Sequence, residues 1–244
     1  MFSGWTDRRA VAPIVAELAG TFLFFFVGMG AVAGLERAAG AGVHLDGAAG
    51  LVVIALAHGV ALAVLASALG FISGAHFNPA VTFGVWLAGK MPWHRAAAYV
   101  VAQLIGAVLA GLALRYVFTL AGNDLGVPRL GPGIDIGPGI LIETVLTVVL
   151  VIAVFGTAID LRGPKLGGLA IGLAVAADIL MGGPLTGAAM NPARWFGPAA
   201  VTGTWDNWFV WIVGPLLGAA IVALAYRFLF EQTDTEVVEM VTEG

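Results

Sequence analysis

Long apolar runs dominate the chain. Ala, Val, Leu, Ile and Gly make up most of six stretches that are long enough to cross a membrane. Because an α-helix rises roughly 1.5 Å per residue, about 20 apolar residues span the hydrocarbon core of a bilayer. The pattern therefore predicts six transmembrane helices, at about residues 11–34, 47–70, 96–120, 138–159, 166–184 and 207–230.

Two further apolar segments, at residues 76–89 and 188–201, are too short to span a membrane. Each contains an Asn-Pro-Ala triplet. Asn is a favoured helix N-cap, and Pro suits the first position of a helix, so each segment is predicted to be a half-helix with a fixed start. Irregular backbone at membrane depth survives only inside protein or along a wet cavity, so two such starts predict a pore or a midplane binding site. The triplets are Asn78-Pro79-Ala80 and Asn191-Pro192-Ala193.

The chain repeats internally. Glu17 of the first predicted helix matches Glu143 of the fourth, and the segment that begins at Gln103 resembles the one that begins at Pro215. Each repeat holds three spans, an odd number, so the second copy must be inverted in the membrane. Inverted repeats with broken helices place a site at the midplane, where the two half-helix N-termini are expected to meet. We therefore expect a single transmembrane domain over residues 1–244, with repeats at about 11–120 and 138–230.

Composition narrows the function classes. Hydrophobic residues make up 60% of the 244 residues and charged residues only 11%, against roughly a quarter in soluble domains. A net charge of −4 argues against a nucleic-acid partner. The absence of cysteine rules out thiol catalysis and thiolate metal sites, and the four scattered histidines lack metal-ligand spacing. We therefore expect no metal and no cofactor.

Lys and Arg predict the orientation, because they concentrate on the cytoplasmic side of membrane proteins. With six spans, both termini lie on one side, and seven basic residues fall there against three on the other. Both termini are thus predicted to be cytoplasmic, with residues 231–244 as an acidic cytoplasmic tail. Arg8 and Arg9 precede a long apolar run without a convincing cleavage site, so we expect a retained first helix. The seven basic residues on the predicted cytoplasmic side are Arg8, Arg9, Lys90, Arg95, Arg162, Lys165 and Arg227.

The two triplets and their flanks resemble the paired signatures of the aquaporin (major intrinsic protein) family. The segments are Ser73-Gly-Ala-His-Phe-Asn-Pro-Ala-Val-Thr82 and Thr186-Gly-Ala-Ala-Met-Asn-Pro-Ala-Arg-Trp-Phe-Gly-Pro-Ala199. The resemblance covers about residues 11–230. It implies an all-α polytopic membrane protein with the hourglass fold, six transmembrane helices, two re-entrant half-helices, and a homotetramer with one pore per subunit.

The half-helix starts suggest how such a pore treats protons. Each N-terminus carries roughly half a positive charge and free N–H donors, so two that face one point repel cations. The amides of Asn78 and Asn191 can each donate to a passing water oxygen while their carbonyl oxygens cap the helices. A water held in this way does not easily accept a proton from its neighbour. The alternative is that both asparagines serve only as caps.

The resemblance also supplies four filter positions. Arg194 follows the second triplet and matches the arginine of the outer constriction, and spacing from the triplets places His58, Ile179 and Ala188 around it. This set is similar to that of the plant tonoplast-intrinsic branch. A small Ala188 and an apolar Ile179 predict an opening wider and less hydrophilic than in a strict water channel. Ammonia or another small neutral solute is then expected to pass beside water, and His58 is a candidate for pH control.

Several other polar residues are predicted to have structural roles. Glu17 and Glu143 are expected to accept backbone N–H bonds from the loops that enter the half-helices, with a proton relay as the alternative. His76 is expected to be a structural hydrogen-bonder, and Gln103 a second supporting residue. Asp178 could pair with Arg194 or His58, or accept backbone bonds on the far side of its helix.

The leading functional prediction is a passive water channel in the plasma (inner) membrane that excludes protons. Its partners are water, small neutral solutes and membrane lipid. A glycerol facilitator is the nearest alternative, although Trp195 and Ala199 replace the Asp and the basic residue of such facilitators. An ion-coupled secondary transporter and an adhesion protein with a vestigial pore are more distant alternatives. An enzyme is not expected, because no acid, base and nucleophile converge.

Overall fold

The computed structural model describes residues 8–44, 47–118 and 124–230, and these are helical with short connections and contain no strand. The predicted acidic tail lies outside the described residues. The described elements are α1 (Arg8–Gly40), α2 (Gly47–Ser73), α3 (Pro79–Leu87), α4 (Trp93–Phe118), α5 (Ile136–Val154) with a π-helical turn (Phe155–Ile159), α6 (Gly167–Thr186), α7 (Pro192–Thr202) and α8 (Val210–Ala225) with a π-helical turn (Tyr226–Phe230).

Six helices are long and apolar enough to cross a membrane, with mean hydropathies between 1.7 and 2.5, which confirms the six predicted spans. The two half-helices begin at Pro79 and Pro192, one residue after each asparagine. The first span is longer than predicted, because α1 continues to Gly40. Gly42 then adopts a φ of +83°, and the Val43 N–H bonds the Ala38 carbonyl at 2.9 Å, a glycine-based helix stop.

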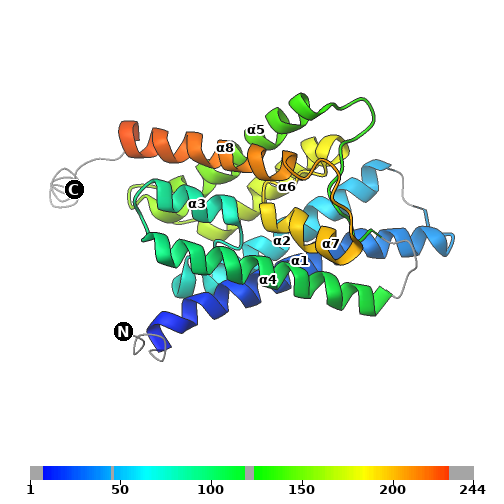
Figure 1. The fold of residues 1–244 in the computed structure, drawn as a ribbon, viewed down its shortest axis with the longest axis horizontal. Helices are drawn as coiled ribbons and strands as arrows, with labels where there is room; N and C mark the ends of the chain where they lie inside the picture. The colour runs from blue at the N-terminus through cyan, green and yellow to red at the C-terminus, as the bar shows by residue number, and fades with distance from the viewer. Residues whose placement is uncertain (1–7, 45–46, 119–123, 231–244) are drawn as a thin grey trace.

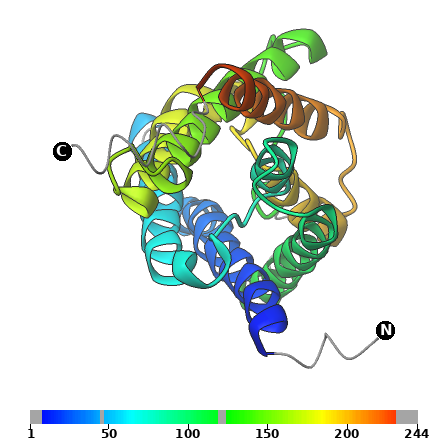
Figure 2. The ribbon, with the colours of Figure 1, turned by 90° about the vertical axis from the view of Figure 1, so that its left-hand side faces the viewer.

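The long helices surround the two half-helices. Figure 2, which looks along the bundle, shows α3 inside the ring of long helices. Each half-helix packs on the last long helix of the other repeat, α3 on α8 and α7 on α4, while α1 packs on α4 as α5 packs on α8. The first residue of α1 and the end of the last π-helical turn lie at the same end of the bundle (Figure 1), as six spans require.

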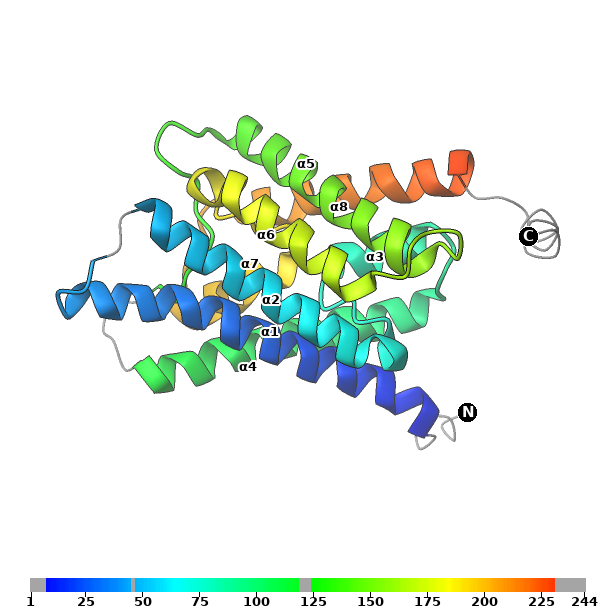
Figure 3. The ribbon, with the colours of Figure 1, turned by 180° about the vertical axis from the view of Figure 1, so that it is seen from behind.

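Helices α2 and α6 cross at small residues and lie side by side when the bundle is seen from behind (Figure 3). A Cβ on Gly59 would lie 2.7 Å from the Gly172 carbonyl oxygen, and a Cβ on Gly168 would lie 2.6 Å from the Ala63 carbonyl oxygen. The crossing therefore needs glycine on both helices. Small residues permit close packing elsewhere too, since a Cβ on Gly106 would lie 2.5 Å from the Leu18 carbonyl oxygen.

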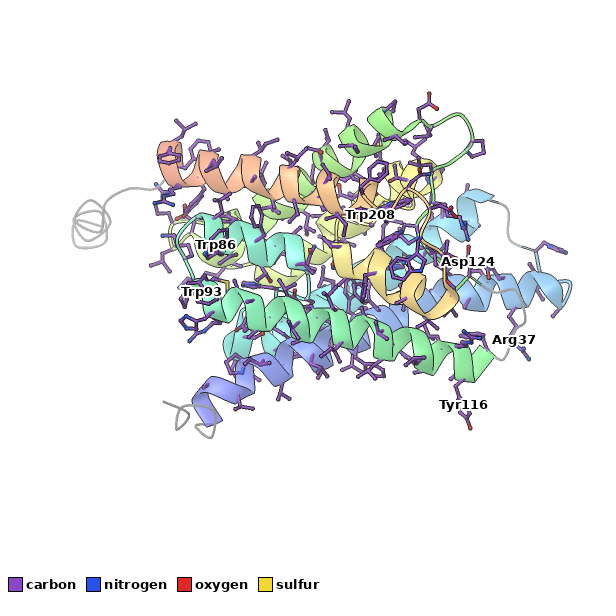
Figure 4. All side chains as sticks on the ribbon, in the orientation of Figure 1. Arg37, Trp86, Trp93, Tyr116, Asp124 and Trp208 are labelled. Atoms are coloured by element: carbon purple, nitrogen blue, oxygen red, sulfur yellow. The ribbon has the colours of Figure 1, made fainter. Side chains whose placement is uncertain are left out.

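Charged and aromatic side chains mark the two ends of the bundle. At the end that holds the termini of the described chain, Arg162 donates to the Phe230 carbonyl at 2.8 Å and Arg227 to the Leu87 carbonyl at 3.2 Å. Hydrogen bonds from Arg162 also hold the pKa of Asp160 well below its usual range. Trp86 and Trp93 lie at this end and Tyr116 at the other (Figure 4), as in the aromatic belts of membrane proteins.

The α2–α6 crossing predicts which glycines tolerate a methyl group. Gly172→Ala forces a Cβ into Ala63 and the Gly59 carbonyl, and overpacking of this kind costs about 1–3 kcal/mol of unfolding free energy. The melting temperature in detergent should then fall by about 2–12 °C. Gly70→Ala, on α2 and with no atom within 4 Å of its Cβ, is the control and should leave the melting temperature unchanged or raise it. Equal melting temperatures for the two variants would contradict the close crossing.

Candidate functional site

Each half-helix is capped by its asparagine. Asn78 has extended backbone, with φ −155° and ψ 118°, and its Oδ1 accepts from the Ala80 N–H at 2.8 Å. Asn191 has nearly the same conformation, and its Oδ1 accepts from the Ala193 N–H at 3.0 Å. Pro79 and Pro192 occupy the first helical positions, where a missing N–H costs nothing. The local sequence therefore fixes both helix starts.

The two caps also reach across the midplane to the opposite repeat. Asn78 Nδ2 donates to the Met190 carbonyl at 2.9 Å, and Asn191 Nδ2 donates to the Phe77 carbonyl at 2.9 Å. This exchange brings the two half-helix N-termini together from opposite faces. Each amide nitrogen carries two hydrogens, so one N–H per asparagine remains for the cavity that both side chains line.

The loops before the half-helices have an unusual backbone that repeats with the inverted symmetry. Ala75 and Phe77 have φ values of +50° and +46°, and Ala188 and Met190 have φ values of +44° and +52°. Residues with a side chain rarely adopt this left-handed region, and they remain there only when their surroundings hold them. All four residues line the same cavity, so the strained segments form part of its wall.

Glu17 holds the first of these loops. Its Oε1 accepts from the Ser73 hydroxyl at 2.7 Å and from the His76 N–H at 2.9 Å. Its Oε2 accepts from the Phe77 N–H at 2.7 Å and from Gln103 Nε2 at 2.8 Å. The carboxylate is fully buried, and four donors compensate its removal from water. Glu17 thus joins the first loop to α2 and α4.

Glu143 does the same for the second loop. Its Oε1 accepts from the Thr186 hydroxyl at 2.6 Å and from the Ala189 N–H at 3.0 Å, and its Oε2 accepts from the Met190 N–H at 2.7 Å. Ser73 and Thr186 were not predicted as supporting residues. The signal was present, because each hydroxyl lies five residues before the asparagine of its triplet.

A repeated aromatic donor fixes the end of the long helix that precedes each loop. The Tyr99 hydroxyl donates to the Ser73 carbonyl at 2.8 Å, and Trp211 Nε1 donates to the Thr186 carbonyl at 3.0 Å. This pair was not predicted from the sequence either. Tyr99 and Trp211 are separated by nearly the same interval as the two asparagines, so an alignment of the repeats could have found them.

The repeats differ behind the half-helices. In the first repeat, the Thr82 hydroxyl contacts His76 Nδ1 at 3.1 Å and accepts from Gln103 Nε2 at 2.9 Å. In the second repeat, Trp195 takes the place of Thr82 and stacks on Trp211, with ring centroids 6.0 Å apart and planes 6° apart. His76 is thus held both by its ring and by its backbone N–H.

The four predicted filter residues come together. His58 on α2, Ile179 on α6, Ala188 in the second loop and Arg194 on α7 line one cavity with both asparagines. Each of the four is at most 6% exposed. They come from separate elements, so the packing of the helix bundle, rather than any local motif, brings the four residues together.

Arg194 is held by the loop that follows α4. Its Nη1 donates to the Gly126 carbonyl at 2.8 Å, and the Gly126 N–H bonds Asp124 Oδ1 at 2.9 Å. The same loop attaches to the C-terminal end of α6, where the Gly131 N–H donates to the Leu185 carbonyl at 2.8 Å. The sequence did not indicate Gly126 as a partner of the arginine.

Asp178 takes neither of the side-chain partners considered for it. Arg194 bonds Gly126, and His58 Nδ1 bonds the Ile54 carbonyl at 2.9 Å. Asp178 is 4% exposed, and its Oδ2 has no hydrogen-bond partner among the residues that the structure describes. Unlike its neighbour Ile179, Asp178 does not line the pore cavity.

Comparisons with known proteins agree with this geometry. The sequence matches the family model of the major intrinsic proteins over residues 4–226. The chain belongs to the major intrinsic protein family. It is 46% identical to "Aquaporin TIP4-4" of Zea mays over 92% of this chain and 89% of the relative. It is 44% identical to "Probable aquaporin TIP3-2" of Arabidopsis thaliana over 92% of this chain and 85% of the relative.

A solved structure shows the same fold. The X-ray structure of the aquaglyceroporin from Plasmodium falciparum superposes with a TM-score of 0.76 over 95% of this chain and 99% of that chain, at 22% sequence identity. Both the expected aquaporin fold and the likeness to the plant TIP aquaporins are therefore confirmed.

The carboxylate contacts predict the effect of removing one acceptor. In Glu143→Gln, either orientation of the amide turns an N–H toward a backbone N–H, of Met190 or of Ala189. A buried donor without an acceptor costs about 1–3 kcal/mol of unfolding free energy. We expect a lower melting temperature and less monodisperse protein in detergent, and Glu17→Gln should have the same effect.

Asp178→Asn is the matched control for loss of a buried acid within the membrane. Asp178 Oδ2 is already a buried polar atom that accepts no hydrogen bond from the described residues, so an amide there exchanges one unpaired buried polar atom for another and removes no bond. Its melting temperature should stay near that of the unsubstituted protein. If all three variants lose stability equally, loss of the carboxylate charge, rather than of an acceptor, explains the effect.

Proposed function

We propose that this chain is a passive channel for water that excludes protons and also conducts ammonia or other small neutral solutes. One observation carries the proposal. Two half-helix N-termini from inverted repeats meet through crossed asparagine amides, inside a cavity that Arg194 also lines. A catalytic role is not part of the proposal, because channels of this family move solutes without changing them.

Proton exclusion follows from the charges and donors around the cavity. The N-terminal ends of α3 and α7 both point at the midplane, and each contributes roughly half a positive charge there. The free N–H of Asn78 and that of Asn191 hold a water by its oxygen, which turns both of its hydrogens away. Arg194 adds a permanent positive charge. Cations are repelled, and the chain of hydrogen bonds that would carry a proton is interrupted.

The filter favours small neutral solutes. Of the four filter residues that line the cavity, Arg194 is charged and His58 carries an imidazole, whereas Ile179 and Ala188 contribute apolar surface. Ala188 occupies little space, so the ring is open on that side. Ammonia is close in size to water and less dependent on a hydrogen-bonding wall, so it is the solute that we expect beside water.

The chain is an integral multi-pass membrane protein, and we propose that it assembles as a homotetramer with both termini in the cytoplasm. The contacts of Arg162 and Arg227 support this orientation, because they place two basic residues at the end that holds the termini of the described chain. For the membrane itself, the plant TIP relatives favour the tonoplast over the plasma membrane expected from the sequence.

Stopped-flow light scattering on proteoliposomes tests the function. We expect osmotic water flux about tenfold or more above that of protein-free liposomes, with low activation energy and no proton leak under a pH gradient. Ammonia uptake, followed with an internal pH dye, should also exceed the protein-free rate. Glycerol uptake should stay close to it.

Water flux no faster than in protein-free liposomes would reject the channel, and the two caps would then be scaffold only. Fast glycerol uptake would replace the proposal with a glycerol facilitator. A flux that saturates with solute or needs an ion gradient would indicate a coupled transporter.

Ala188→Phe tests the position of the filter. Ala188 lines the cavity and is 2% exposed, so a phenyl ring there has only the lumen to enter. Water flux per reconstituted protein should fall about tenfold or more. Ala200→Phe, at an exposed position on the half-helix α7, should keep the original flux. An unchanged flux in Ala188→Phe would remove residue 188 from the constriction.

A further inference from the structure

The imidazole of His58 lies against the backbone of α1 at a single glycine. A Cβ on Gly28 would lie 2.5 Å from Cδ2, 2.5 Å from Nε2 and 2.9 Å from Cε1 of His58. Real Cβ atoms are not found at such distances, so the ring occupies the space that any side chain at position 28 would take. The three atoms nearest to that Cβ thus all belong to the His58 ring.

Two more contacts fix the ring in this place. His58 Nδ1 lies 2.9 Å from the Ile54 carbonyl oxygen, one turn earlier on α2. A carbonyl oxygen only accepts, so Nδ1 carries the proton of this bond. Phe24, one turn before Gly28 on α1, meets the imidazole edge to face at a centroid distance of 6.0 Å.

The consequence concerns Nε2, the other ring nitrogen. With the proton on Nδ1, Nε2 is an acceptor, yet it is buried and has no hydrogen-bond partner among the described residues. It points at the gap over Gly28. The filter thus contains a histidine whose acceptor nitrogen is turned to the wall of the pore.

We propose that Gly28 is a specificity-determining positioning residue of the filter, because it provides the recess that keeps the His58 imidazole out of the lumen. The proposal rests on the channel function proposed above. With glycine at 28, the ring lies on the wall, the opening is wide, and its lining is weakly polar. With any larger residue, the ring swings into the lumen, narrows it, and presents its nitrogens to the permeating molecules.

Displacing the His58 ring costs little unfolding free energy but changes the pore strongly. The atoms in the way belong to the far end of one side chain, which can rotate about its own bonds, and not to backbone. Gly28 therefore differs from Gly172, where a methyl group meets backbone of the opposite helix. A substitution at 28 should change selectivity while the fold remains.

The experiment compares the unsubstituted protein with four variants in proteoliposomes: Gly28→Ala, His58→Ala, the double variant and Gly34→Ala. Gly34 also lies on α1 and has no atom within 4 Å of its Cβ, which makes it the matched control. We expect Gly28→Ala to lower water flux about threefold or more, and ammonia flux by a larger factor. Gly34→Ala should behave as the unsubstituted protein.

The double variant separates positioning from a general structural effect. If Gly28 acts only by seating the ring, Gly28→Ala should have no further effect once His58 is alanine, so the double variant should equal His58→Ala. An equal effect of Gly28→Ala in both backgrounds would overturn the proposal. If Gly28→Ala alone fails to fold, the double variant must fold, and its failure would overturn the proposal too.

A spectroscopic measurement does not depend on conduction. Imidazole nitrogen NMR of the protein with labelled histidine, with the His58 signals assigned from His58→Ala, reports which ring nitrogen carries the proton. We expect the Nδ1–H form in the unsubstituted protein and in Gly34→Ala, and its loss in Gly28→Ala. An unchanged His58 signal in Gly28→Ala would overturn the proposal. Absent flux in the unsubstituted protein, combined with the expected NMR change, would reject the channel function and leave the recess standing.

Discussion

The meeting of two half-helix N-termini at the midplane is the constraint on which the rest of the structure depends. A helix start leaves N–H groups without partners, and lipid cannot supply acceptors. Here each asparagine caps its own helix through Oδ1 and bonds the opposite repeat through Nδ2. Neither half-helix completes this arrangement alone. The long helices surround this junction, and both asparagines line one cavity there.

Two buried carboxylates make this junction possible. The loops into the half-helices hold alanine, phenylalanine and methionine in left-handed backbone, which these residues avoid in isolation. Glu17 and Glu143 accept hydrogen bonds from the backbone N–H groups of those loops, and the donors offset the removal of each carboxylate from water. A charge in the membrane here stabilises backbone geometry, which explains why a carboxylate recurs at the matching place in both repeats.

The inverted symmetry is kept near the midplane and lost behind it. The caps, the carboxylates, the loop hydroxyls and the aromatic donors recur in pairs. Behind the half-helices, the first repeat has a polar cluster of His76, Thr82 and Gln103, and the second has stacked tryptophans. The filter belongs to the asymmetric part, because Arg194 and the carbonyl of Gly126 have no counterpart among the paired contacts. A symmetric junction thus lies next to an asymmetric set of filter residues, to which we assign the selectivity in our proposal.

The sequence by itself determined the spans, the half-helix starts and the inverted repeat. These features depend on the length of apolar runs and on Asn-Pro cap chemistry, which act over a few residues. It also indicated the two carboxylates, through the match between the repeats. The four filter positions were predicted from their spacing to the triplets and the resemblance to the family. Only the tertiary structure decided that each asparagine bonds the opposite repeat, that Arg194 bonds Gly126, and that the His58 ring lies over Gly28. Those contacts join segments far apart in the chain, and their geometry follows from how the helices pack.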